Sequence, residues 1–375
     1  MARGLTAERV RQDVDVVARA GLELETFLEE AMESVRRAVP WASACVGTHD
    51  PSTHMLTSAR KYGELRGEDE LDHEFALLEY GMVEPTAFTE LARTGTDAAG
   101  VHLVHDGDVR ASARMDLFMR PHFGMGDEAR LAFRDGRELW GAMAIFRDLR
   151  DAPFDASEVD FLASLAPAFA RGVRAGLLSR MADVIAPLPG DGPAVIIVGS
   201  DNQVTQMTPA AERWLADLAD SPTHSDPVSP IAALIGAARR YGRGETTLPP
   251  RCRLRTACGM WLVLQAGPLS SFRDREGDVV VTIEEARPPE IVALVVAAFG
   301  LTPRERDVTQ FVLQGVDTKE IAAQLHLSAY TVQDHLKSVF DKAGVRSRRE
   351  LISRVYFDQY VPRMGRELTP SGWFV

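Results

Sequence analysis

The spacing of hydrophobic residues changes several times along the first 180 residues, and each change predicts a new element. Residues 22–38, rich in Leu and Glu, predict a helix. Short alternating runs then predict strands. The clearest pair, EARLAFR and RELWGAMAIF, flanks Asp135-Gly136, a dipeptide typical of hairpin turns. Apolar residues at helical spacing, from Phe161 to Leu177, predict one long amphipathic helix over residues 157–182.

Residues 190–286 show the same mixture of patterns on a smaller scale. The run GPAVIIVGSDNQVTQMTPAAERWL predicts two strands and then a helix that Thr208 caps, with Pro209 at its first position. CRLRTA, WLVLQAGPL and DVVVTIEEA predict three more antiparallel strands. SPTHSDPVSP predicts a mobile loop between the two halves, and PEIVALVVAAF predicts a connecting helix.

Residues 301–355 carry unusually clear start and stop signals for helices. Three Ser/Thr/Asp residues are each followed by Glu three positions later, a spacing that predicts three reciprocal capping boxes. These pairs are Thr302 with Glu305, Asp317 with Glu320, and Ser347 with Glu350. Gly315 and Gly344 stand where left-handed C-terminal caps are expected. Helices are therefore predicted at about 303–314, 318–324, 329–343 and 348–360.

The tight turn predicted at Leu325–Ser328 joins two of these helices in the manner of a helix-turn-helix. At roughly 100° per residue, the helix at 329–343 places Val332, Leu336, Val339 and Phe340 on one face. The opposite face carries Tyr330, Gln333, Asp334 and Lys337. In helix-turn-helix proteins this second helix enters the major groove of DNA.

Three residues on the polar face have side chains suited to reading bases. Gln can pair with adenine, Lys with guanine, and Asp can accept from the cytosine amino group, each good contact discriminating by about 1–3 kcal/mol. We therefore predict base contacts for Gln333, Asp334 and Lys337. Contacts with the DNA backbone are predicted for Thr331, Tyr330, Lys319, Arg304 and Arg346.

LTPRER, the GxxxKEIA pattern from Gly315 to Ala322, TVQDHLK and AGVRSRREL closely resemble the DNA-binding domain of LuxR/NarL-type bacterial transcription regulators. The resemblance implies that Gln333, Asp334 and Lys337 occupy base-reading positions. It also implies that the last helix, 348–360, pairs two subunits. Many family members carry Lys or Arg where this chain has Tyr330, a departure that lowers the positive charge expected at the groove.

Weaker resemblances concern the two preceding regions. The hairpin GRELWGAMAIFR followed by PFDASEVDFLASLAP resembles a GAF sensor domain, which implies an antiparallel sheet flanked by helices with a ligand cavity on one face. Residues 190–286 resemble a divergent PAS fold.

Composition and charge agree with a regulator that acts in the cytoplasm. At 375 residues, with 45% hydrophobic and 26% charged, the chain suits two or three globular domains. Neither a signal peptide nor a membrane-length apolar run is present in the sequence, and no membrane partner is expected. The net charge is −12, whereas residues 301–355 hold nine Lys/Arg and seven Asp/Glu, or +2, which leaves −14 for the rest.

Candidate chemistry outside the helical segment is weaker. Three cysteines without metal-type spacing argue against a disulfide scaffold or zinc site. The loop VHLVHDGDVR could supply metal ligands from His102, His105, Asp106 and Asp108, but a polar loop is the simpler interpretation. Cys45 is either a redox sensor or a buried structural thiol, and the second is preferred. The indication that His122 ligates haem is weak, and no cofactor is expected.

The sequence thus predicts a multidomain fold: α+β GAF-like and PAS-like sensor domains, then an all-α four-helix LuxR-type helix-turn-helix domain. Its expected segments are a lead-in (1–19), the GAF-like domain (20–182), the PAS-like domain (190–286), a connecting helix (287–300), the DNA-binding domain (301–361) and a tail (362–375). The expected function is operator-specific transcription regulation, without enzymatic activity, under an unknown small-molecule effector or protein partner. Double-stranded DNA, a second copy of the chain in a homodimer and RNA polymerase are the candidate partners. The alternative is a partner-docking regulator that reads no DNA sequence.

Overall fold

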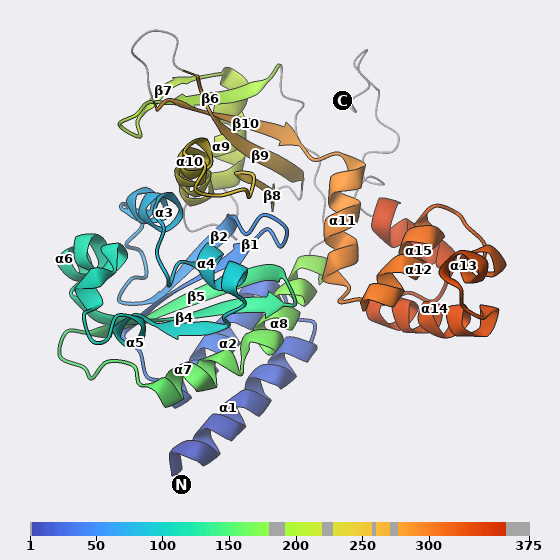
Figure 1. Ribbon diagram of the computed structural model, residues 1–375, viewed down its shortest axis with the longest axis horizontal. Coiled ribbons are helices and arrows are strands. Elements are labelled where there is room, and N and C mark those ends of the chain that lie inside the picture. Colours follow the sequence, from blue (N-terminus) through green and yellow to red (C-terminus); the bar gives the residue numbers. More distant parts are fainter. Residues whose placement is uncertain (1, 180–191, 220–227, 257–259, 271–276, 358–375) are drawn as a thin grey trace. The chain divides into compact units, whose positions relative to one another are not determined.

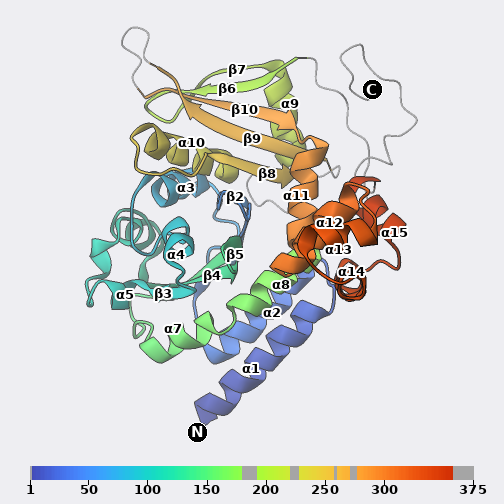
Figure 2. The same ribbon diagram turned by 45° about the vertical axis from the view of Figure 1, so that its right-hand side comes forward.

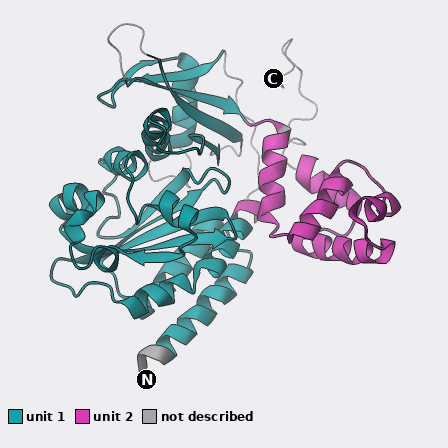
Figure 3. Ribbon diagram, in the orientation of Figure 1, with its two compact units in different colours: residues 1–176, 190–285 teal, residues 177–189, 286–375 magenta. Residues whose placement is uncertain are grey.

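Two antiparallel sheets and a helical C-terminal segment make up the protein in the computed structural model, which describes residues 2–179, 192–219, 228–256, 260–270 and 277–357 (Figure 1). The chain divides into two compact units (Figure 3). The first contains residues 1–176 and 190–285, and the second contains residues 177–189 and 286–375. Each unit is described by itself.

The first sheet has five strands in the order β2-β1-β5-β4-β3, all antiparallel. The strands are β1 (Ser43–His49), β2 (Leu56–Gly63), β3 (Ala98–Gly100), β4 (Met125–Asp135) and β5 (Glu138–Asp148). The predicted hairpin is confirmed, with its turn one residue later than expected. Asp135 still pairs with Glu138, so the loop is Gly136-Arg137, and Gly136 takes the left-handed φ of 63° that favours glycine.

Helices cover both faces of this sheet. The helices of the first 180 residues are α1 (Ala2–Arg19), α2 (Leu24–Ala38), α3 (Asp72–Gly81), α4 (Phe88–Thr94), α5 (Val101–Val104), α6 (Arg120–Phe123), α7 (Ala156–Ala163) and α8 (Ala166–Ser179). On one face α2 and α8 lie side by side (Figures 1 and 2), and Phe169 stacks on Phe133 of β4 at 4.5 Å. Gly172 is required there because an added Cβ would lie 2.1 Å from the Phe27 ring. The lead-in is itself a helix, packed on α2 through buried Val10 and Val14.

The prediction of one long helix over residues 157–182 is wrong. The structure has two helices, α7 and α8, bent by 41° at a break between Ala163 and Ala166. Pro167 explains the break, because proline has no N–H to donate to the residue-163 carbonyl and its ring crowds the preceding turn. Residues 180–182 lie outside the described part of the chain. No single described helix is long and apolar enough to cross a membrane. Among the described residues, only the bent pair α7 and α8, taken together, has the length and composition of a membrane span.

The second sheet has the order β7-β6-β10-β9-β8. Its elements are β6 (Ala194–Val198), β7 (Val204–Met207), α9 (Pro209–Ala219), α10 (Val228–Gly242), β8 (Arg251–Arg255), β9 (Trp261–Pro268) and β10 (Val279–Glu285). The five predicted strands and the helix capped by Thr208 are confirmed. The predicted loop SPTHSDPVSP falls mostly outside the described residues, but its last three residues, 228–230, begin α10 and are not loop.

The hydrophobic core of the second sheet extends to residues that flank the first sheet. Met55, Ala76 and Tyr80 pack into the cluster formed by the second sheet and α10. Helix α3 meets α10 so closely that a Cβ added at Gly236 would lie 2.9 Å from the nitrogen of Gly81.

A buried ion pair also joins the two sheets. The carboxylate of Asp50, which follows β1, accepts hydrogen bonds from Nε and Nη2 of Arg253 on β8 at 2.7 and 2.6 Å. It also accepts from the Arg253 backbone N–H at 2.9 Å. Asp50 is 2% exposed and Arg253 9%. Because both partners are withdrawn from water, this pair fixes the relation between the two sheets.

From residue 286 on, the described residues of the second unit form the helices α11 (Pro288–Ala298), α12 (Pro303–Leu313), α13 (Thr318–Leu325), α14 (Ala329–Ala343) and α15 (Arg348–Ile352). The helix predicted over 348–360 is α-helical only to Ile352 and continues as a π-helical turn, Ser353–Phe357, while residues 358–360 lie outside the described part. Gly315 and Gly344 take left-handed φ values of 82° and 65°, which confirms their predicted role at the ends of α12 and α14.

Candidate nucleic-acid interface

A short turn between α13 and α14 sets the geometry of the candidate interface. Helix α13 ends at Leu325, so the turn begins at His326 rather than at Leu325 as predicted. His326 takes a left-handed φ of 54°, a conformation uncommon for residues other than glycine. The next backbone N–H, of Leu327, donates to the Ala322 carbonyl at 2.9 Å and closes the end of α13. The chain therefore turns within three residues and starts α14 at once.

The N-terminus of α14 is capped as the sequence predicted. The Ser328 Oγ accepts from the backbone N–H of Thr331 at 3.0 Å. The Thr331 hydroxyl lies 2.9 Å from the same Oγ and is therefore held at the first turn. Helix N-termini favour anions because their free N–H groups point outward. Thr331 thus lies where a phosphate contact is geometrically reasonable.

Helix α14 has one buried face and one exposed face. Val332, Leu336 and Val339 are buried, which confirms three of the four residues assigned to the packing face; Phe340 is half-buried. The exposed stripe consists of Tyr330, Gln333, Asp334 and Lys337. These four residues, spaced three and four apart, lie along one side of the helix, and Tyr330 is 77% exposed. The structure thus brings the three predicted base-reading residues together on one accessible surface.

The other predicted contact residues lie at the ends of neighbouring elements. Lys319 is exposed in the first turn of α13, and Arg346 is exposed between α14 and α15. Arg304, in the first turn of α12, is exposed and lies 3.5 Å from Asp307 in an ion pair. The Asp307 carboxylate reduces the positive charge that Arg304 can present to DNA. Among the described residues, Lys319 and Arg346 form no such ion pair. Their contacts with DNA stay predictions.

A buried carboxylate holds α14 against α12. Glu305, 5% exposed, accepts from the Ser338 hydroxyl at 2.6 Å and from the Lys342 ammonium at 2.6 Å. The backbone N–H of Thr302 donates to the same carboxylate at 2.7 Å. Burial alone would raise the pKa of Glu305, but these hydrogen bonds outweigh it and lower the pKa to about 2. Glu305 is therefore a charged link across the domain at neutral pH.

The sequence predicted only half of the role of Glu305. The capping box with Thr302 is confirmed in both directions. The contacts with Ser338 and Lys342 were missed, because residues more than thirty positions apart leave no local signal. The available hint was a Ser and a Lys one helical turn apart, on the flank of α14 between its exposed stripe and its buried face.

The other two capping boxes are only half formed. The Asp317 carboxylate accepts from the N–H groups of Lys319 and Glu320, but the Glu320 carboxylate is reached by Gln324 instead. Ser347 accepts from the Glu350 N–H at 3.2 Å, while the Glu350 carboxylate accepts from the N–H of Arg346. Both helices still start where predicted, because the forward half of each box satisfies the free N–H groups.

The weaker chemical candidates all lie in the first unit. Within the described residues, no three His, Cys, Asp or Glu side chains lie close enough together to hold a metal ion, and this includes the loop of His102 and His105. Cys45 is a free thiol on β1. Burial, and then the nearby Asp72 carboxylate, raise the pKa of Cys45 to about 12. Cys45 is thus protonated at neutral pH, unlike a reactive thiolate.

Comparison with known proteins concerns the second unit. Residues 300–355 match the model of the family described as bacterial regulatory proteins, luxR family. The chain is similar to the spore germination protein GerE of Bacillus subtilis, with 40% identity over 52 residues that make up 14% of this chain and 70% of GerE. It is also similar to the transcriptional regulatory protein UhpA of Escherichia coli, with 45% identity over 56 residues, 15% of this chain and 29% of UhpA.

Longer relatives are matched over a small part of their length. A helix-turn-helix-type transcriptional regulator of Mycobacterium tuberculosis is 48% identical over 53 residues, which cover 14% of this chain but only 6% of that protein. Among solved structures, the phage VqmA-DPO complex is 18% identical, with a TM-score of 0.24, and the match covers 48% of this chain and 87% of that one. At that TM-score we take neither a fold nor a ligand from it.

Proposed function

The chain belongs to the LuxR family of bacterial regulatory proteins through its C-terminal domain, and on that premise we propose that it is a transcription regulator that reads a specific DNA operator. The observation that carries the proposal is the exposed stripe of α14, in which Gln333, Asp334 and Lys337 face solvent while the opposite face is packed. The matched family and UhpA are described as regulatory proteins, which supports a regulator and not an enzyme.

In this proposal α14 enters the major groove, and its first two turns contact base edges. Gln333 and Lys337 donate to adenine and guanine, and Asp334 accepts from cytosine. Lys319, Thr331, Tyr330, Arg346 and Arg304 hold the phosphates on either side. Tyr330 contributes a hydroxyl in place of a charge, so the interface relies more on hydrogen bonds than one with Lys or Arg at this position.

The first unit is the sensor in this proposal. The first sheet, which is flanked by helices and has a cavity on one face, supports the proposal that residues 20–182 are a GAF-like domain. Residues 190–286 supply the PAS-like domain, and a small molecule or a protein partner controls DNA binding through both. Two copies pair through the region after Ser347, in the cytoplasm, and RNA polymerase is the partner that the bound dimer contacts. Paired recognition helices then require an inverted repeat in the operator.

Selection from a random pool of DNA duplexes tests the proposal directly. The full-length protein and residues 287–375 are each expected to enrich one symmetric motif. Lys337→Ala is expected to relax the preference at one base position by about 1–3 kcal/mol. Lys319→Ala is expected to weaken binding to all sequences and to reduce the salt slope by about 0.9. Arg137→Ala serves as the control, because it removes an equal charge from the exposed β4–β5 turn of the other unit. It is expected to change neither the base preference nor the salt slope.

Two outcomes would contradict the proposal in different ways. Equal loss of affinity in Lys337→Ala and Lys319→Ala, with no change in sequence preference, would refute the base-reading assignment. No enriched motif from either protein, with only weak and steeply salt-dependent binding, would favour a partner-docking regulator that reads no sequence.

A further inference from the structure

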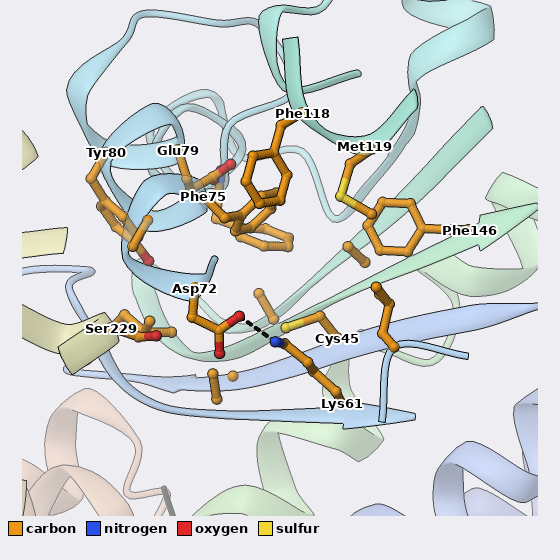
Figure 4. A pocket seen from close by; sticks show the side chains of 18 of the residues that line it. Cys45, Lys61, Asp72, Phe75, Glu79, Tyr80, Phe118, Met119, Phe146 and Ser229 are labelled. Atoms are coloured by element: carbon orange, nitrogen blue, oxygen red, sulfur yellow. Dashed lines mark hydrogen bonds and ion pairs between the residues drawn. The ribbon is translucent and has the colours of Figure 1, made fainter. Parts of the chain in front are cut away.

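A cavity lies between the first sheet and the helices that cover one of its faces (Figure 4). Strands β1, β2 and β5 form its floor, and α3 together with the π-helical turn Met115–Met119 forms its roof. The empty space amounts to about 760 Å³, part of it open to solvent.

The roof and one end of the cavity are aromatic. Phe118 lies at the centre of this group, with its ring centroid 5.4 Å from that of Phe75 on α3 and 5.8 Å from that of Phe123 on α6. Phe146 of β5 and Met119 complete this end, and Figure 4 shows their side chains facing the same space. Tilted rings at these separations leave flat apolar surfaces, which suit a ring-sized apolar body. A π-helical turn is rare and occurs frequently at functional sites.

The polar end of the cavity presents a donor and an acceptor side by side. Lys61 of β2 forms an ion pair with Asp72 of α3, and its ammonium also donates to the Glu68 carbonyl and lies 3.2 Å from Asp69. The side chains of Lys61 and Asp72 are 8% and 11% exposed. Figure 4 shows the pair beside Cys45, on the floor of the cavity and across from the aromatic rings.

Each of the other ionisable groups in the wall is neutral or paired. Glu79 accepts from Arg130 at 2.9 Å and lies 3.2 Å from Arg114. Burial lowers the pKa of His49 to about 3, so the imidazole is neutral, and its Nε2 lies 2.8 Å from the Tyr80 hydroxyl. A ligand with a net charge would therefore enter a largely apolar space in which the opposite charges already have partners. Burying a charge without a counterion is strongly unfavourable.

We propose that this cavity binds an uncharged small molecule that has a flat apolar body and a head group carrying adjacent hydrogen-bond donor and acceptor atoms, such as a carboxamide. The acceptor of the head group takes a hydrogen bond from Lys61 in place of the Asp69 carboxylate, its donor bonds to Asp72, and the ring lies against Phe75 and Phe118. This inference rests on the proposed function, because it names the class of effector that the sensor unit binds.

The second sheet takes part in the same site. Ser229, from the first turn of α10, lines the cavity, although its helix belongs to the second sheet domain. Helix α3 connects the two regions, since Asp72 and Phe75 line the cavity while Gly81 contacts α10. A ligand under α3 therefore contacts both sheet domains at once, so its binding can change how they pack.

Three probes that share one ring test the ligand class. Benzamide, benzoate and benzylamine are titrated at pH 7 into the full-length protein, and ligand-observed NMR gives each dissociation constant. Benzamide is expected to bind at least about ten-fold more tightly than either charged probe. Ala144→Leu places a larger side chain on the cavity floor, and Lys61→Met removes the donor, so each is expected to weaken benzamide by about ten-fold or more.

The control lies on the same strand. Met143→Leu changes the residue next to Ala144, which faces the opposite side of the sheet, and it should leave benzamide binding unchanged. Thermal unfolding without probe establishes that each variant is folded. If Ala144→Leu is not folded, benzamide binding by Lys61→Met alone tests the proposal.

Binding of benzoate or benzylamine as tight as that of benzamide, or no binding of any probe, would overturn the proposal. So would unchanged benzamide binding in the folded Lys61→Met variant. Operator binding measured on the same samples separates the two proposals. Intact operator binding without benzamide selectivity rejects only the ligand class, whereas loss of sequence-specific DNA binding by the unaltered protein rejects the proposed function itself.

Discussion

Replacing the buried carboxylate of Glu305 by an amide tests how helix α14 is held against α12. Its folded-state pKa of about 2, against an ordinary value of 4.5, corresponds to about 3 kcal/mol of folding free energy if the whole shift is assigned to the native state. The Lys342 side chain is 34% exposed, so water screens part of this interaction. We therefore expect Glu305→Gln to reduce the stability of the domain by about 1–2 kcal/mol at pH 7.

The pH dependence of this loss follows from the direction of the pKa shift. Because the folded pKa lies below the unfolded one, the carboxylate contributes its full stability above about pH 4.5 and loses it as the pH falls toward 2. Glutamine does not titrate. The difference between the unaltered protein and Glu305→Gln should therefore be constant from pH 7 to about pH 5 and shrink below it.

Hydrogen exchange measured by mass spectrometry on the full-length protein reports this local stability through peptides covering α12 and α14. At pH 7 the expected loss corresponds to about a five- to thirty-fold faster exchange in Glu305→Gln. Asp307→Asn is the matched control, a carboxylate on the same helix whose ion pair with Arg304 is solvent-exposed, and it should change exchange little. Equal protection in Glu305→Gln and the unaltered protein at pH 7, or a difference that persists at low pH, would refute the reasoning.

Three further predictions concern capping, the buried ion pair and the free thiol. Ser328→Ala removes the N-cap of α14 and should cost about 1 kcal/mol, seen as faster hydrogen exchange in its first turns; unchanged exchange would contradict the role of this cap. Asp50→Asn leaves the Arg253 guanidinium buried without its counterion and should destabilise the first unit by about 3–5 kcal/mol in thermal unfolding, whereas a change below about 1 kcal/mol would show that water reaches the pair. Cys45, with a pKa of about 12, should alkylate slowly at pH 7 and faster as pH rises toward 12, and rapid alkylation of the folded protein at pH 7 would exclude a buried thiol.

Local signals predicted the second unit well because its helices start and stop at residues whose side chains act within four positions. Thr302, Ser328 and Gly344 perform the capping expected of them, and the exposed stripe of α14 follows directly from helical periodicity. The two partly formed boxes show the limit of the same signals. Glu350 has the right spacing for Ser347, yet its carboxylate accepts from Arg346, because spacing does not decide between neighbouring N–H groups.

Long-range features of the first unit could not be predicted from the sequence. The hydrophobic spacing from Phe161 to Leu177 continues across Pro167, so it predicted one helix where the backbone breaks. The pairing of Asp50 with Arg253 spans about two hundred residues, and a single buried Asp gives no sign of its partner. The aromatic cavity collects residues from separate elements that have ordinary core patterns when each is considered alone.

The close contact of Gly81 with Gly236 has a practical consequence for dividing the chain into fragments. A cut between residues 176 and 190 would uncover the apolar faces of α3 and α10 on separate pieces and leave Asp50 without Arg253. Both pieces would then expose surface that promotes aggregation on expression. A cut after Glu285 keeps that core whole, so the first sheet domain and the second should be produced together as residues 1–285.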